Sequence, residues 1–212
     1  METAILLPVH PDRCELIANG RATMEFKKVI PNNEAPFKVY IYCTLPPRSE
    51  YFWHHDEMGR RTIGEYLNEL LKLPNGQIVY DYGMRVVCEG GDYTQDNFLC
   101  QKVIGEFICD YVLGHCEMAN ADIAEQQGCM HREKLLEYSN GKEVRGLHIS
   151  DLKIYDEPMK LDEFHKPCSA IKNCPNGSFR EAGRSLDKCF DCGSRITRPP
   201  QSYCYVEELT NG

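Results

Sequence analysis

The chain has no apolar stretch long enough to cross a membrane, and its start does not resemble a leader. No window approaches the roughly 18 uncharged apolar residues of a membrane helix. The opening METAILLPVHPDRCE has no basic segment, and Pro8 and His10 interrupt its apolar run. Basic residues are also few, because 24 Lys and Arg stand against 32 Asp and Glu and leave a net charge of −8. We therefore expect a soluble cytoplasmic protein without membrane contact and without a general phosphate-binding surface, which would need a local excess of Lys and Arg.

The acidic charge is uneven along the 212 residues. Residues 61–164 carry 19 acidic and 10 basic side chains, whereas residues 165–212 carry 5 acidic and 7 basic ones. The acidic middle segment could imitate a row of phosphates and bind a basic host protein, as an interaction protein encoded by a phage or other mobile element would. It could equally serve only to keep the protein in solution.

Cysteine is plentiful, with 12 residues, but a disulfide framework is not expected in a chain without a secretory signal. Eight cysteines are scattered, several of them in apolar runs, and are interpreted as small buried hydrophobic residues. These are Cys14, Cys43, Cys88, Cys100, Cys109, Cys116, Cys129 and Cys204.

The other four cysteines form two close pairs that predict a metal site. Five residues separate Cys168 from Cys174. Fourteen residues follow before the second pair, in which two residues separate Cys189 from Cys192. Four thiolates suit the tetrahedral geometry of a structural zinc ion, and His165 could replace one of them. Redox-sensing or unligated thiols, and a disulfide pair, are the alternatives. Residues 165–195 are therefore predicted to be a Cys-rich, zinc-binding appendage.

The first third of the chain combines a strand pattern, a helix pattern and a polar alternation. Residues 5–10 predict a strand, and Asp12–Asn19 predict a short helix that ends at Gly20. After this glycine, polar residues alternate with apolar ones: Arg21, Thr23, Glu25 and Lys27 with Ala22, Met24 and Phe26. Such a strand could form one wall of a ligand pocket or a solvent-facing edge strand.

This segment resembles the signature of the ASCH domain, a member of the PUA-like superfamily, which usually reads Gly-x-Lys-Thr-x-Glu-x-Arg-Lys. Four further blocks are similar to the bacterial and phage branch of that family, in the same order: Pro36–Thr44, Lys102–Asp110, His148–Pro158 and Arg198–Glu208. The resemblance implies an α+β fold built on a small PUA-like β-barrel with short helices. It also implies a pocket that binds RNA, a nucleobase or a nucleotide.

Two positions depart from the family signature. Ala22 stands where the family usually carries Lys, and Lys27 stands where it carries Arg. The family's amidohydrolase, which acts on acetylcytidine, uses that Lys and a Thr whose position is here occupied by Glu25. Because alanine cannot titrate, the resemblance implies a pocket more firmly than this reaction, and Glu25 is left as the candidate catalytic group of an alternative hydrolase of modified nucleosides.

The resemblance also suggests how the chain is organised. The barrel is expected over residues 1–164 plus 196–212, with insertions at about 45–100 and 114–143. In the first insertion, Thr62–Leu73 has the apolar spacing of a helix and Gln77–Val87 that of a strand. In the second, His131–Ser139 predicts a helix that ends at Asn140-Gly141.

The predicted ligand site takes residues from several of these blocks. Arg21, Thr23, Glu25 and Lys27 form one wall, where Glu25 would accept from an exocyclic amine and Lys27 would neutralise a phosphate. The family resemblance implies that the block with His148, Ser150 and Asp151 lines the mouth of the barrel pocket. His148 could also be a core residue whose hydrogen bonds are made within the protein. Stacking aromatic rings are expected from Tyr42 or Tyr203.

Overall fold

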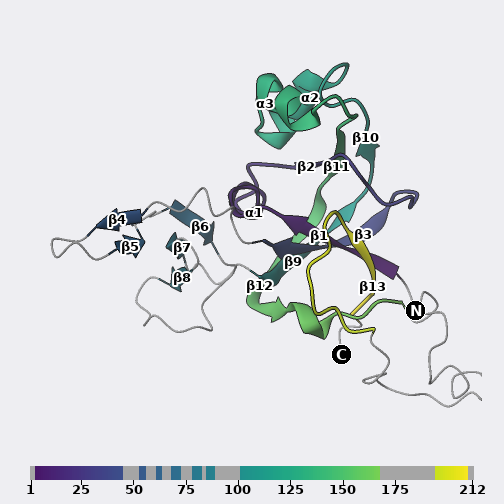
Figure 1. Cartoon of the computed structure of the whole chain (residues 1–212). Coiled ribbons are helices and arrows are strands. Elements are labelled where there is room, and N and C mark those ends of the chain that lie inside the picture. Colours follow the sequence, from purple (N-terminus) through teal and green to yellow (C-terminus); the bar gives the residue numbers. More distant parts are fainter. Residues whose placement is uncertain are drawn as a thin grey trace, which may run out of the picture.

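The computed structural model describes residues 3–44, 101–167 and 194–209 in full, and between residues 45 and 100 only the backbone of five short strands. A five-stranded sheet forms the centre, in the order β12-β9-β3-β1-β13 (Figure 1). Its strands are β1 (Thr3–Val9), β3 (Phe37–Cys43), β9 (Lys102–Cys109), β12 (Ser150–Lys160) and β13 (Cys204–Glu207). β1 and β3 run parallel, and the other neighbours are antiparallel.

A three-stranded antiparallel sheet packs beside the first. It consists of β2 (Met24–Lys27), β10 (Val112–Leu113) and β11 (Arg145–His148), in the order β10-β11-β2. The chain passes between the two sheets at one corner: β9 leads into β10 through Asp110 and Tyr111, and β11 leads into β12 through Ile149. Asp110 and Tyr111 therefore lie beside the end of β11, where the backbone N–H of His148 donates to Tyr111 O.

β1 is buried on both of its faces, which explains why it is an almost continuous apolar run. Successive side chains of a strand point to opposite faces. Ile5, Leu7 and Val9 accordingly pack toward the second sheet and the helix α1 (Pro11–Ala18), together with Cys14 and Ile17 of that helix. Ala4 and Leu6 pack on the other face with residues that include Tyr40, Phe164, Ile196 and Val206.

Two short helices cover the outer face of the three-stranded sheet (Figure 1). They are α2 (Ala121–Gly128) and α3 (Arg132–Ser139), and they pack against Met24 and Phe26 of β2. Gly128 allows this contact, because a Cβ there would lie 2.1 Å from the ring of Phe26. α3 ends at Asn140 in the left-handed conformation, so the helix predicted from the Asn-Gly signal is confirmed.

The α+β class and the strands expected from the family blocks are confirmed, but two details differ. No closed barrel is seen among the strands that the structure describes, because the two sheets meet at a corner without joining into one ring. The prediction of a helix over residues 62–73 is wrong. That stretch contains β5 (Arg61–Ile63) and β6 (Asn68–Lys72).

The strands of this insertion pair locally. β4 (Trp53–His55) pairs with β5, while β6, β7 (Ile78–Tyr82) and β8 (Arg85–Cys88) form an antiparallel sheet. A short apolar run fits both helix and strand periodicities. The neighbouring Ile78-Val79-Tyr80, rich in strand-forming residues, offers β6 a partner that the helical pattern does not take into account. The strand predicted at 77–87 is thus a pair of strands.

Most of the scattered cysteines whose side chains the structure describes are buried, as predicted, while the side chains of Cys88 and Cys100 lie outside the description. Cys14, Cys43, Cys109 and Cys116 lie in the core, Cys204 is half-buried, and only Cys129 is exposed among those in the described ranges. Burial, helped by the nearby charge of Asp110, raises the pKa of the Cys109 thiol to about 12, so this thiol is inert. In the same described ranges, no helix has the length and apolar character needed to cross a membrane.

Candidate functional site

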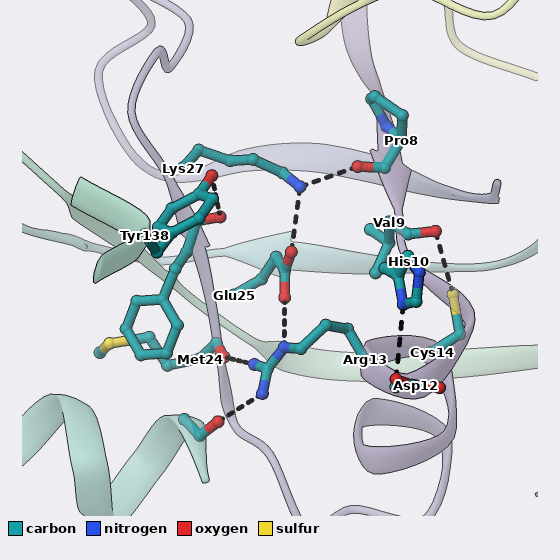
Figure 2. A network of polar contacts seen from close by, with 12 residues as sticks. Pro8, Val9, His10, Asp12, Arg13, Cys14, Met24, Glu25, Lys27 and Tyr138 are labelled. Carbon is teal, nitrogen blue, oxygen red and sulfur yellow. Dashed lines mark hydrogen bonds and ion pairs between the residues drawn. The ribbon is translucent and has the colours of Figure 1, made fainter. Parts of the chain in front are cut away.

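Glu25, the candidate catalytic residue, lies at the centre of a buried cluster of charges (Figure 2). Its Oε2 accepts from Arg13 Nε at 3.1 Å, and its Oε1 accepts from Lys27 Nζ at 3.0 Å. The two cations also donate to backbone carbonyls: Lys27 to Pro8 at 2.8 Å, and Arg13 to Met24 at 2.7 Å and to Gly128 at 2.5 Å. The buried triad, as we call Arg13, Glu25 and Lys27, thereby ties β1, α1, β2 and α2 together.

The charges of the buried triad determine the protonation state of Glu25. Burial alone would raise the pKa of its carboxyl, but the nearby Lys27 ammonium and Arg13 guanidinium outweigh this and hold the pKa below its usual range. The carboxylate is therefore ionised at neutral pH, and each of its oxygens already accepts from a cation. Such a group serves as a counter-ion, and it is a weak proton acceptor for a substrate.

Arg21 and Thr23 do not join Glu25 and Lys27 on one wall, because β2 begins only at Met24. Arg21 is exposed and pairs with Glu15 of α1. Thr23 is also exposed, and its backbone N–H donates to Gln127 O at 2.7 Å. Of the four predicted wall residues, the structure brings together Glu25 and Lys27 only.

A second polar cluster occupies the corner where β9 and β11 leave their sheets. His148 Nδ1 and Asp110 Oδ1 are 2.6 Å apart, and the rings of His148 and Tyr111 stack with centroids 4.4 Å apart and planes at 15°. The Tyr111 hydroxyl donates to Gln127 Oε1 at 3.1 Å, and the His148 backbone N–H donates to Tyr111 O at 3.1 Å. We call Asp110, Tyr111, Gln127 and His148 the corner cluster.

The corner cluster is charged and accessible. Slight burial would raise the pKa of Asp110, but the hydrogen bond and the charge of His148 outweigh it and place this pKa below its usual value. The Asp110 side chain is 43% exposed, so an ionised carboxylate faces solvent. Because an ionised carboxylate can only accept a hydrogen bond, His148 Nδ1 is the donor in its contact with Asp110 Oδ1. This bond fixes the orientation of the imidazole.

Asp110 and Tyr111 line an open groove of about 600 Å³. Its other walls come from the loop between β2 and β3 and from the segment around β11. The lining residues are Ile30, Pro31, Asn32, Asn33, Ala35, Asp110, Tyr111, Val112, Gly114, Glu143 and Arg145. Arg145 Nη2 donates to Glu143 Oε2 at 3.1 Å. The groove therefore offers an aromatic ring, amides, an ionised carboxylate and a guanidinium.

Of the predicted mouth residues, only His148 belongs to this site. Ser150 donates to Ile108 O at 2.9 Å, and Asp151 is exposed with a positive φ of 47°. Tyr203 packs edge-on against Tyr205, and Tyr42 is buried in the core. None of these four lines the groove beside Asp110 and Tyr111.

Sequence reasoning missed Asp110, Tyr111 and Arg13. The change from an apolar strand to Asp110-Tyr111 was visible as the end of a strand, but its partner His148 lies 38 residues away. Arg13 stands in the predicted helix 12–19, and only the packing of α1 on β2 brings it to Glu25.

The four cysteines predicted to bind zinc, Cys168, Cys174, Cys189 and Cys192, lie outside the described residues. Within the described part of the chain, no group of His, Cys, Asp and Glu could hold a metal ion. The two flanks of this segment meet, because His165 and Arg195 form a β-bridge and His165 Nδ1 lies 3.1 Å from Ser194 Oγ. The zinc site stays a prediction.

No protein-family model and no curated protein matches the sequence. Solved structures do match: an ASCH protein from Zymomonas mobilis is similar with a TM-score of 0.50 at 12% identity, over 97% of this chain and 88% of that one. Its tyrosine-to-phenylalanine and serine-to-alanine variants match with the same TM-score at 13% and 12% identity, over 97% of this chain and 91% and 89% of theirs. The chain therefore has the ASCH fold, as the sequence blocks predicted.

Proposed function

We propose that this ASCH-fold chain binds a nucleobase, of RNA or of a free nucleoside, at the corner cluster. The observation that carries the proposal is the ring of Tyr111, which lines an open groove and stacks on the ring of His148 behind it. Each ring is held at its polar edge, Tyr111 by Gln127 and His148 by Asp110. Rings that are already ordered lose little conformational entropy when a ligand stacks on them.

Stacking on Tyr111 supplies most of the binding free energy in this proposal. A base that stacks on an aromatic side chain contributes about 1–3 kcal/mol, and every base has a face that can stack. Stacking therefore explains affinity, and it leaves the choice of base to the groups around the ring.

In this proposal, Asp110 determines which base binds. Its ionised carboxylate accepts hydrogen bonds and donates none, so it pairs with an exocyclic amine such as that of cytosine. Uracil presents a carbonyl oxygen at the same place, which the carboxylate would repel. We expect cytidine to bind more tightly than uridine.

Phosphate contacts play a small part at this groove. Its one guanidinium, Arg145, already pairs with Glu143, and Asp110 adds a further negative charge. With a net charge of −8, the chain also offers little long-range attraction to a nucleic-acid backbone. The affinity for a nucleoside should depend only weakly on salt, because few counterions are released.

The contacts of the buried triad favour binding over hydrolysis of a modified nucleoside. Ala22 is buried in the core and cannot titrate, and both oxygens of Glu25 accept from cations. No observation in the described residues favours a basic host partner. That function stays a prediction from composition.

The proposal is tested by titrating cytidine, uridine and a short RNA, with tyrosine fluorescence or calorimetry as the readout. Tyr111→Ala should weaken cytidine binding about tenfold or more, since it removes the stacking ring, whereas Tyr111→Phe should keep most of it. Tyr138→Ala is the matched control, because Tyr138 is 37% exposed against 38% for Tyr111 and lies on α3. Unchanged binding in Tyr111→Ala, or an equal loss in Tyr138→Ala, would refute the proposal.

A further inference from the structure

α3 packs on the rest of the molecule through a single row of side chains. Of its eight residues only Leu135 and Ser139 are buried, and these lie one turn apart on the same side of the helix. α2 and α3 lie together at one end of the molecule, outside the two sheets (Figure 1). A helix shorter than about 12 residues is marginal on its own in water, so its stability depends on what packs against it.

One exposed side of α3 carries an apolar residue between two charges. Leu136 is 47% exposed. A rotation of about 100° per residue places Arg132 and Glu137 on the same side of the helix as Leu136, one to either side of it. Tyr138 lies on the opposite flank, where its ring centre is 4.7 Å from the ammonium group of Lys28. We call Arg132, Leu136 and Glu137 the outer face of α3.

The charges of the outer face lack partners within the described part of the chain, because neither Arg132 nor Glu137 forms an ion pair there. Their order is also the reverse of what a lone helix favours, which is negative charge near its N-terminus and positive charge near its C-terminus. Arg132 and Lys134 stand in the first turn, and Glu137 stands in the last. Of the four charged residues of α3, only Glu133 has the favoured sign.

We propose that α3 pairs with α3 of a second copy of this chain, antiparallel and about a two-fold axis. The first turn of each helix then lies beside the last turn of the other, so Arg132 meets Glu137 of the partner subunit on both sides of the axis. Leu136 lies within a turn of the axis and packs on Leu136 of the partner subunit. The charges that a lone α3 disfavours become complementary contacts, and the two helix dipoles are antiparallel. This inference is independent of the nucleobase site.

Sedimentation equilibrium tests the pairing. One short helix per chain makes a small and weak interface, so the natural chain should pass from the mass of one chain to that of two between about 10 µM and 1 mM. Leu136→Ser should raise the dissociation constant about tenfold or more, because the dimer loses an apolar side chain from each copy. Val29→Ser is the matched control, since Val29 is 53% exposed in the segment after β2 and should not affect the pairing.

Charge reversal tests the orientation of the two helices. Arg132→Glu and Glu137→Arg should each weaken the dimer about tenfold or more, because like charges then face each other twice. The double variant should restore the dimer. Each single reversal gives α3 a charge of the sign that the helix dipole favours, so the melting temperature of the dilute monomer should not fall. Weaker pairing without loss of monomer stability therefore separates a lost contact from an unfolded helix.

Two results would overturn the inference. A natural chain that stays monomeric up to about 1 mM would leave the outer face to solvent or to a different protein. A dimer that tolerates Leu136→Ser and both single reversals would use another surface. None of these variants alters the corner cluster, so cytidine binding should be unchanged in all of them, and the cytidine titration decides the proposed function separately.

Discussion

The buried triad and the corner cluster use similar residues for opposite purposes. In the triad, the Glu25 side chain is 4% exposed and both of its oxygens accept from cations, which themselves donate to three carbonyls. In the corner cluster, the carboxylate of Asp110 contacts one imidazole and faces solvent. A charge whose bonds are all made within the protein stabilises the fold, whereas a fixed charge at the surface can still bind a ligand.

The comparison places the accessible groove away from the residues of the family signature. The signature led to Glu25 and Lys27, which the fold uses to join α1 to β2. The groove with accessible polar groups is lined instead by residues outside the signature, among them Asp110, Tyr111 and Arg145.

The largest effect is expected where the triad is broken. Arg13→Ala leaves the Glu25 carboxylate buried with one partner fewer and removes bonds to Met24 and Gly128, so the free energy of unfolding should fall by about 3–5 kcal/mol. Urea denaturation followed by circular dichroism measures it. Arg21→Ala is the control, since its exposed pair with Glu15 should contribute less than about 1 kcal/mol. Equal losses in the two variants would contradict the distinction between buried and exposed charges.

Acid should act on the same triad. Because the pKa of Glu25 is lower in the folded protein than its ordinary value of 4.5, its contribution to stability is present above pH 4.5 and is lost as pH falls through the folded pKa. The urea midpoint of the natural chain should therefore drop steeply in acid. Glu25→Gln should be less stable at neutral pH and show a shallower drop. Parallel pH curves for the two proteins would exclude Glu25 as the source.

The predicted zinc site offers a test away from both clusters. Elemental analysis should find about one zinc ion per chain, and a strong chelator should open 165–195 to proteases while the two central sheets stay folded. Cys189→Ser should reproduce this effect, and Cys129→Ser, which changes an exposed cysteine on the described surface, should not. Protein purified without zinc, with all four thiols reactive, would overturn the prediction.

The smallest effect on stability is expected at the corner. Asp110→Asn replaces an exposed acceptor and should change the free energy of unfolding by less than about 1 kcal/mol. It should nevertheless reduce the preference for cytidine over uridine, because an amide can also donate to a carbonyl oxygen. Calorimetric titration of both nucleosides checks this. An unchanged preference would remove Asp110 from base recognition.

Local patterns predicted most strands of the two sheets and little of the site. The apolar run at 5–9 and the Asn-Gly signal after 139 are properties of neighbouring residues, so β1 and α3 were predictable. The helix expected at 62–73 was wrong because its apolar residues fit two periodicities. Strand pairing, which depends on distant residues, decided between them.

The candidate site depends on contacts that no local pattern contains. The alternation at 21–27 placed Met24 and Phe26 on one face, but it could not show that the opposite face is buried against α1. His148 was singled out, whereas Asp110 and Tyr111 become its partners only through the antiparallel register of β10 and β11. Register is a tertiary property.

The most direct test of the account is a map of backbone amide chemical shifts during a cytidine titration. The account predicts saturable changes at Asn32, Asn33, Asp110, Tyr111 and His148, with Arg13, Glu25 and Lys27 almost unaffected. Changes centred on the buried triad, with the corner cluster silent, would contradict it.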